Sequence, residues 1–118
     1  MDLRPHIEKF SRRFAEVEAA LSDPKVFDNP QRAQELSREY ARLKELVAYG
    51  RSYLKTLAHL DENRALLKSE PPDSELAQLA KDEAARLEIE EKRLAQQIQS
   101  GILPPNPPAP ARISMMEG

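Results

Sequence analysis

The chain has 118 residues, of which 40% are hydrophobic, 32% charged and 5% aromatic, and its formal net charge is -2 at pH 7. This length suits one domain with tails. So high a share of charge leaves only narrow apolar stripes for burial, and the abundance of Ala, Leu, Glu, Arg, Lys and Gln is typical of long helices. A β-sandwich or an α/β nucleotide-binding fold is therefore not expected, and neither half of the chain has a bulk attraction for nucleic acid.

The chain contains no cysteine, which excludes disulfides, thiolate metal sites and a cysteine nucleophile. The N-terminal residues are charged and do not resemble a signal peptide. No stretch approaches the roughly 20 apolar residues that a membrane-spanning helix needs. We therefore expect a soluble, cytoplasmic protein with no membrane partner.

The first segment has apolar residues at steps of three and four, which indicates one face of a helix. They are Leu3, Ile7, Phe10, Phe14, Val17 and Leu21. Pro5 is compatible with the first helical turn, where its missing N–H would have no partner. Pro24 should end the helix, since proline disfavours the α conformation in the residue before it. We predict a helix over residues 4–22, after which Val26 and Phe27 could fold back as an apolar clasp.

A second helix should begin at Asn29-Pro30, because Asn is a good N-cap and Pro suits the first helical position. Two apolar tracks follow: Leu36, Tyr40, Leu43, Val47, Leu54 and Leu57, and in parallel Leu46, Tyr53, Leu60 and Leu67. The tracks keep their phase across Gly50, whereas a loop there would usually reset it. We predict one helix over residues 30–69, with a break into two helices at Gly50 as the alternative.

Two consecutive prolines stop the second helix, and Asp73 is the predicted N-cap of a third over residues 73–100. Its apolar residues are Leu76, Leu79, Ala80, Ala84, Leu87, Leu94 and Ile98. Gly101 lies where a left-handed residue would terminate the helix.

The predicted fold is all-α: an antiparallel, coiled-coil-like three-helix bundle with one long central helix. The third helix should cover most of the far end of the central helix. We assign residues 1–101 to the bundle and residues 102–118 to a Pro-rich tail or linker, which should be extended and semi-rigid.

Groups for bond chemistry are scarce. His6 and His59 lie in different predicted helices without a carboxylate cluster, and the three glycines form no phosphate-binding pattern. We therefore expect that the chain is not an enzyme, and we predict no catalytic, cofactor-binding or metal-binding residues, no cofactor and no small-molecule substrate.

Basic residues offer a candidate binding surface. Lys9, Arg12 and Arg13 form a small strip on the first helix, and Arg38 and Arg42 lie one turn apart on the second, on the face opposite its apolar stripe. Such charges usually keep a helix soluble. The alternative is a docking contact with RNA phosphates or an acidic protein surface.

Five short segments carry more specific patterns. They are Leu-Ser-Asp-Pro at 21–24, Asn-Pro at 29–30, Leu-Ser-Arg-Glu-Tyr-Ala-Arg-Leu at 36–43, Asp-Ser-Glu-Leu-Ala-Gln-Leu-Ala at 73–80, and Leu-Pro-Pro-Asn-Pro at 103–107. In this order, over residues 5–108, they resemble the N-terminal helical domain of bacterial class I peptide chain release factors.

That resemblance implies a helical domain of a translation termination factor, acting in protein biosynthesis. It implies docking at the base of the ribosomal stalk, on the stalk-base protein and rRNA, and an influence on the partner GTPase release factor and the release-factor methyltransferase. The chain has no Gly-Gly-Gln hydrolysis loop and no Pro-x-Thr or Ser-Pro-Phe codon-reading tripeptide. It also departs from the family's pattern at residues 111–116, so we expect either an N-terminal fragment or a small stand-alone relative.

A second hypothesis is a structural coiled-coil adaptor that self-associates. The first predicted helix is about half as long as the second, so part of the central helix could remain exposed as a partner surface.

Overall fold

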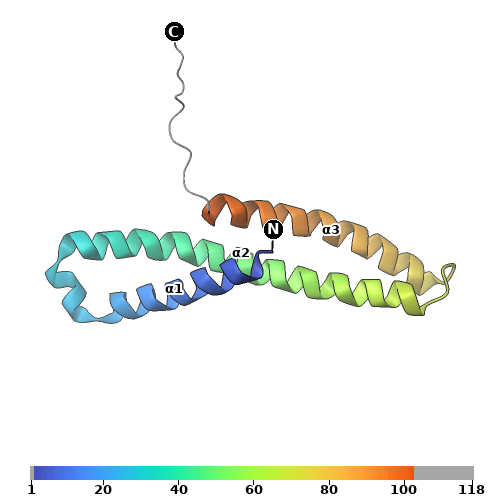
Figure 1. The fold of residues 1–118 in the computed structure, drawn as a ribbon, viewed down its shortest axis with the longest axis horizontal. Helices are drawn as coiled ribbons and strands as arrows, with labels where there is room; N and C mark the ends of the chain where they lie inside the picture. Colours follow the sequence, from blue (N-terminus) through green and yellow to red (C-terminus); the bar gives the residue numbers. More distant parts are fainter. Residues whose placement is uncertain (1, 103–118) are drawn as a thin grey trace, which may run out of the picture.

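A computed structural model of the protein describes residues 2–102 as three α-helices and one short 3-10 helix. The elements are α1 (Arg4–Ser22), η1 (Pro24–Asp28), α2 (Pro30–Ser69) and α3 (Glu75–Ile102). The helices α1 and α3 run antiparallel to the long α2 (Figure 1), and no strand occurs in the described part of the chain. The predicted all-α fold with one long central helix is confirmed. The predicted Pro-rich tail lies outside the described residues, except for its first residue, which ends α3.

Side-chain caps set the boundaries that the sequence predicted near the first corner. The Asp23 carboxylate accepts a hydrogen bond from the backbone N–H of Lys25 at 3.0 Å, and the Asn29 side-chain oxygen accepts one from the backbone N–H of Arg32 at 3.2 Å. Each cap is followed by a proline at the first helical position. The predicted helix start at Asn29 is confirmed.

The short helix η1 was not predicted, and it changes the expected apolar clasp. Val26 is buried in the main core, whereas Phe27 is 65% exposed. In a 3-10 helix successive side chains point about 120° apart, so two adjacent residues do not face the same neighbour. The clasp prediction is therefore right for Val26 and wrong for Phe27.

The predicted single central helix is confirmed, because α2 continues through Gly50. A Cβ added at Gly50 would lie 3.1 Å from Cγ2 of Ile7 and 3.3 Å from the ring of Phe10. The residue therefore marks a close approach of α1 to α2, and the alternative of two helices is wrong.

Both ends of α3 differ from the sequence-based expectation. Ser74, and not Asp73, is the N-cap: its hydroxyl accepts a hydrogen bond from the backbone N–H of Ala77 at 3.0 Å. Gly101 is helical and does not end the helix in a left-handed conformation. A Cβ at Gly101 would overlap the side chain of Leu46, so the glycine permits close contact between α3 and α2.

The main core runs along the contact between α1 and α2, from the first corner to the middle of α2, where the end of α3 joins it. It contains Leu3, Ile7, Phe10, Val17, Val26, Ala33, Leu36, Leu43, Leu46, Val47, Tyr53, Leu94 and Ile98. The helix α1 covers the first half of α2, and α3 covers the second half (Figure 1). Each flanking helix packs mainly on α2, so the three helices lie together only around the middle of the molecule.

The distal part of the α2–α3 hairpin is built differently. Its buried α3 residues are Ala77, Ala80 and Ala84, whereas Leu76 is 44% and Leu79 is 66% exposed. The expected burial of these two leucines is wrong. The buried residues Leu87, Leu94 and Ile98 follow a repeat of alternating three- and four-residue steps. Extended toward the N-terminus of α3, this repeat places the alanines, and not the leucines, against α2.

Candidate functional site

A depression of about 320 Å³ lies where α1, α2 and the last residue of α3 meet. Its lining residues are His6, Lys9, Phe10, Arg13, Arg42, Leu43, Leu46 and Ile102. Three of these side chains are cationic, one is an imidazole and four are apolar. The depression therefore combines apolar surface with several hydrogen-bond donors that favour an anionic group.

The structure brings three of the five predicted basic residues together. Lys9, Arg13 and Arg42 line the depression, whereas Arg12 and Arg38 are exposed and are not among its lining residues. The sequence predicted Arg42 on the face opposite the apolar stripe. Instead, Arg42 shares the depression with two leucines of α2, so it lies at the edge of that stripe. The buried arc of α2 is wider here because the end of α3 approaches it as well as α1.

Sequence reasoning gave no role to His6 or to the apolar lining. One signal was present: His6, Lys9 and Arg13 are spaced three and four residues apart, which places them along one edge of a helix. The contributions of Leu46 and Ile102 carried no such signal, because they depend on where α3 ends against α2.

The charge of Arg13 is largely compensated. Its Nε and Nη2 atoms donate to the two carboxylate oxygens of Glu39 at 2.6 and 2.8 Å, and its Nη1 lies 3.3 Å from Glu16. The hydrogen bond from Arg13 holds the pKa of Glu39 below its usual value, although desolvation opposes this shift. The hydrogen bond to Glu39 is also the largest cause of a raised pKa of Arg13, and the hydrogen bond to Glu16 adds to it. This bidentate pair fixes α1 against α2 beside the depression.

The other two cations are available for a partner. Within residues 2–102, neither Lys9 nor Arg42 forms an ion pair with a carboxylate. Both side chains are exposed at the rim of the apolar surface. The depression can therefore bind a surface that presents an anionic group next to an apolar one.

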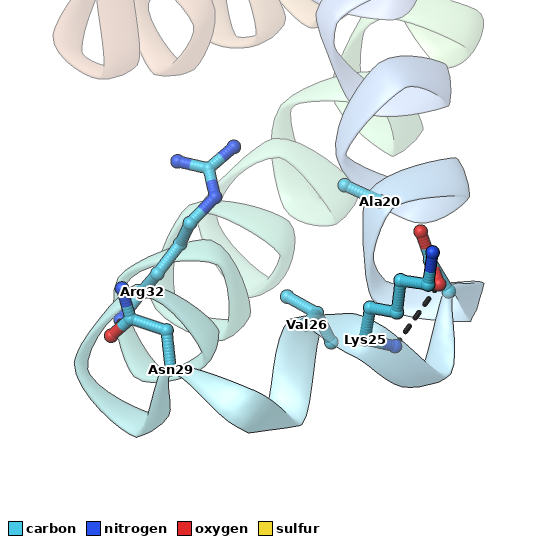
Figure 2. Close-up of a pocket in the computed structure, with 6 residues that line it drawn as sticks. Ala20, Lys25, Val26, Asn29 and Arg32 are labelled. Carbon is cyan, nitrogen blue, oxygen red and sulfur yellow. Dashed lines mark hydrogen bonds between the residues drawn. The ribbon is translucent and has the colours of Figure 1, made fainter.

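A second depression, of about 270 Å³, lies at the corner between α1 and α2. Figure 2 shows Arg32 on one side of it and Lys25 on the other, with Val26 between them. Its polar residues Asp23 and Asn29 are already engaged in capping the helices. We therefore interpret this depression as a consequence of the corner's fold, and the first depression is the better candidate site.

Two further properties concern the described part of the chain as a whole. Between residues 2 and 102 there is no group of three or more histidine and carboxylate side chains that could hold a metal ion. None of the helices there is long and apolar enough to cross a membrane.

Comparison with known proteins gives a consistent family match. The model of the PCRF domain matches residues 10–116. Curated relatives called peptide chain release factor 1 include those of Pelobacter propionicus, 42% identical over 101 residues, Akkermansia muciniphila, 38% over 104 residues, and Campylobacter concisus, 33% over 101 residues. The alignments cover 86%, 88% and 86% of this chain but only 27%, 28% and 27% of the relatives. The chain thus spans about a quarter of their length, and no solved structure matches it significantly.

Proposed function

The chain belongs to the PCRF domain family, and on this premise we propose that it is a ribosome-docking domain of a translation termination factor. It acts by surface complementarity and not by bond chemistry, since the chain itself holds no Gly-Gly-Gln hydrolysis loop and no codon-reading tripeptide. Its partners in this proposal are the stalk-base protein and rRNA of the ribosome in the cytoplasm. The partner GTPase release factor and the release-factor methyltransferase are further candidates.

The observation that supports docking is the depression lined by Lys9, Arg13 and Arg42. Two of these cations have no carboxylate partner in the described chain, and they adjoin buried apolar surface. Such cations increase the rate of encounter with an anionic surface, and the apolar contact retains the complex. Arg38, one turn from Arg42, would extend the basic surface along α2.

The rigid arrangement of the helices suits this role. Glu39 holds Arg13 and thereby orients α1 on α2, while Gly101 lets the end of α3 approach Leu46 at the floor of the depression. The binding surface is therefore formed before a partner arrives, which lowers the entropic cost of association.

The test is co-sedimentation of the chain with purified ribosomes at low and high salt. We expect binding that weakens with salt, and we expect the double substitution Arg38→Glu/Arg42→Glu to weaken it and to make its logarithmic salt dependence shallower. The matched control is Arg51→Glu/Lys55→Glu, which makes the same change of charge at two exposed residues one turn apart on the distal half of α2.

Three outcomes contradict the proposal. If the unmodified chain does not bind ribosomes at low salt, it has no docking function. If Arg38→Glu/Arg42→Glu binds as well as the unmodified chain, these residues take no part. If Arg51→Glu/Lys55→Glu weakens binding equally, only net charge matters and the depression is not the site.

A further inference from the structure

The distal tip of the α2–α3 hairpin exposes leucines that no other part of the described chain covers. Leu67, Leu76 and Leu79 are 38%, 44% and 66% exposed. Leu76 and Leu79 are three residues apart in α3 and are therefore neighbours on its surface. A soluble helix normally turns such side chains toward its own core.

The register of the hairpin places Leu67 at the same level along the hairpin as the other two. Leu60 of α2 packs in one cluster with Ala84 and Leu87 of α3. Because the helices are antiparallel, moving seven residues toward the tip from both sides brings Leu67 opposite residues 77–80. The three leucines therefore lie at the same end of the hairpin, and we call them together the tip patch.

The loop beside the tip patch is acidic, although a lysine bounds it on each side. Between Lys68 and Lys81 the chain has three acidic residues, Glu70, Asp73 and Glu75, and no basic one. None of the three forms an ion pair with another described residue. Since Ser74 supplies the N-cap of α3, capping does not require these carboxylates.

We propose that the tip patch binds a basic protein surface that presents an apolar side chain. The leucines provide the apolar contact, and the carboxylates attract lysine or arginine around it. Nucleic acid is disfavoured because its phosphates would face three carboxylates. A second copy of this chain is disfavoured because a symmetric contact would bring two acidic loops together.

This interaction is separate from the proposed ribosome docking at the depression, and it has the opposite charge preference. The test uses the isotope-labelled chain and a 14-residue helical peptide of leucine and lysine, with a leucine and glutamate peptide of the same pattern as the control. We expect the lysine peptide to change the amide NMR signals of residues 66–82, and we expect its binding to weaken as salt rises from 0.05 to 0.5 M. The glutamate peptide should bind at least tenfold more weakly.

Two variants separate the apolar and the charged contributions. Leu76→Ser/Leu79→Ser should weaken binding of the lysine peptide at least tenfold, and Glu70→Lys/Asp73→Lys should weaken it while the leucines remain. The control is Ile89→Ser, which changes another exposed apolar residue of α3 outside the tip patch and should leave affinity unchanged. These residues are exposed or partly exposed, so circular dichroism should show full helicity in each variant.

Several results overturn the proposal. Equal affinity for both peptides removes the charge preference, and unchanged affinity in Leu76→Ser/Leu79→Ser removes the leucines. Signal changes confined to residues around the depression place the binding elsewhere. A stable dimer in sedimentation that Leu76→Ser/Leu79→Ser dissociates assigns the patch to a second copy, and binding of an RNA oligonucleotide at residues 66–82 assigns it to nucleic acid.

Discussion

The two halves of α2 pack against their partner helices in different ways. In the first half, large side chains meet large ones: Leu36, Leu43 and Val47 of α2 share a core with Ile7 and Phe10 of α1. In the distal half, alanines of α3 face α2, and two leucines beside them face outward. The comparison shows that the amount of apolar surface left exposed depends on which residues the helical repeat turns inward.

The reason is that the phase of a long helix is set where its packing is strongest. Leu94 and Ile98 are almost fully buried in the main core, and they fix the rotation of α3 around its axis. Toward the tip the same rotation turns alanines inward, and small side chains allow the helices to approach closely. Leu76 and Leu79 are then left for another surface.

The largest expected effect comes from Ile98→Ala, which removes a fully buried side chain in the middle of the molecule. We expect a loss of about 3 kcal/mol in the free energy of unfolding, because a cavity adds to the lost burial. Urea denaturation measures this loss, and hydrogen exchange should show faster opening in all three helices. The control Ile89→Ala changes a 71% exposed residue and should stay within about 0.5 kcal/mol. A change in exchange that leaves the distal tip unaffected would mean that the two halves unfold independently.

The packing of the distal half is tested by Ala80→Leu. Ala80 is buried against α2, so extra carbon atoms there should overpack the interface and cost about 2 kcal/mol. The matched substitution Leu79→Ala, at the neighbouring outward position, should change stability by less than about 0.5 kcal/mol. Thermal and urea unfolding of both variants give the comparison. If Ala80→Leu stabilises the protein, the distal helices are not closely packed, and the explanation for the exposed leucines is wrong.

The sequence predicted the helices well because their signals are local and long. Apolar periodicity kept its phase across Gly50, and Asn29 and Pro30 form a recognisable helix start. The rotation of α3 was missed at Leu76 and Leu79, because leucine is the more hydrophobic residue there and the decisive contacts lie four to six turns away. Gly101 was misread because its role depends on the approach of Leu46, which is distant in the sequence.

The candidate site was predictable only in part, because some of its features are local in the sequence and others depend on distant contacts. The basic residues of α1 and α2 are visible in the sequence, and three of the five line one depression. These basic residues adjoin apolar surface from the end of α3 because of the register of α3 along α2. Residue spacing within one helix does not specify that register. The compensation of Arg13 by Glu39 joins residues 26 apart and has the same origin.

A smaller effect should separate the two candidate caps of α3. Ser74→Ala removes the hydroxyl that accepts from the backbone N–H of Ala77, and we expect a loss of about 1 kcal/mol in the free energy of unfolding. Asp73→Ala removes no cap and should cost less than half as much. Urea unfolding measures both values, and amide exchange near residues 75–78 should quicken only in Ser74→Ala. Equal losses in the two variants would contradict the assignment of Ser74.

The smallest effect concerns Glu39 in the first half of the molecule. Its ion pair with Arg13 is partly exposed, and such pairs contribute little to stability. The folded state lowers the pKa of Glu39 below the value of about 4.5 that it has in the unfolded chain. The contribution of Glu39 to stability is therefore present at neutral pH, and it is lost as the pH falls below about 4.5 and passes the pKa of the folded state. We therefore expect Glu39→Gln to be slightly less stable than the unmodified chain at pH 7 and to approach it in acid. Urea unfolding between pH 7 and pH 3 measures the difference, and Glu16→Gln, at the more exposed and more distant partner of Arg13, should give a smaller one. A difference that stays constant over this range would show that Glu39 acts through packing and not through its charge.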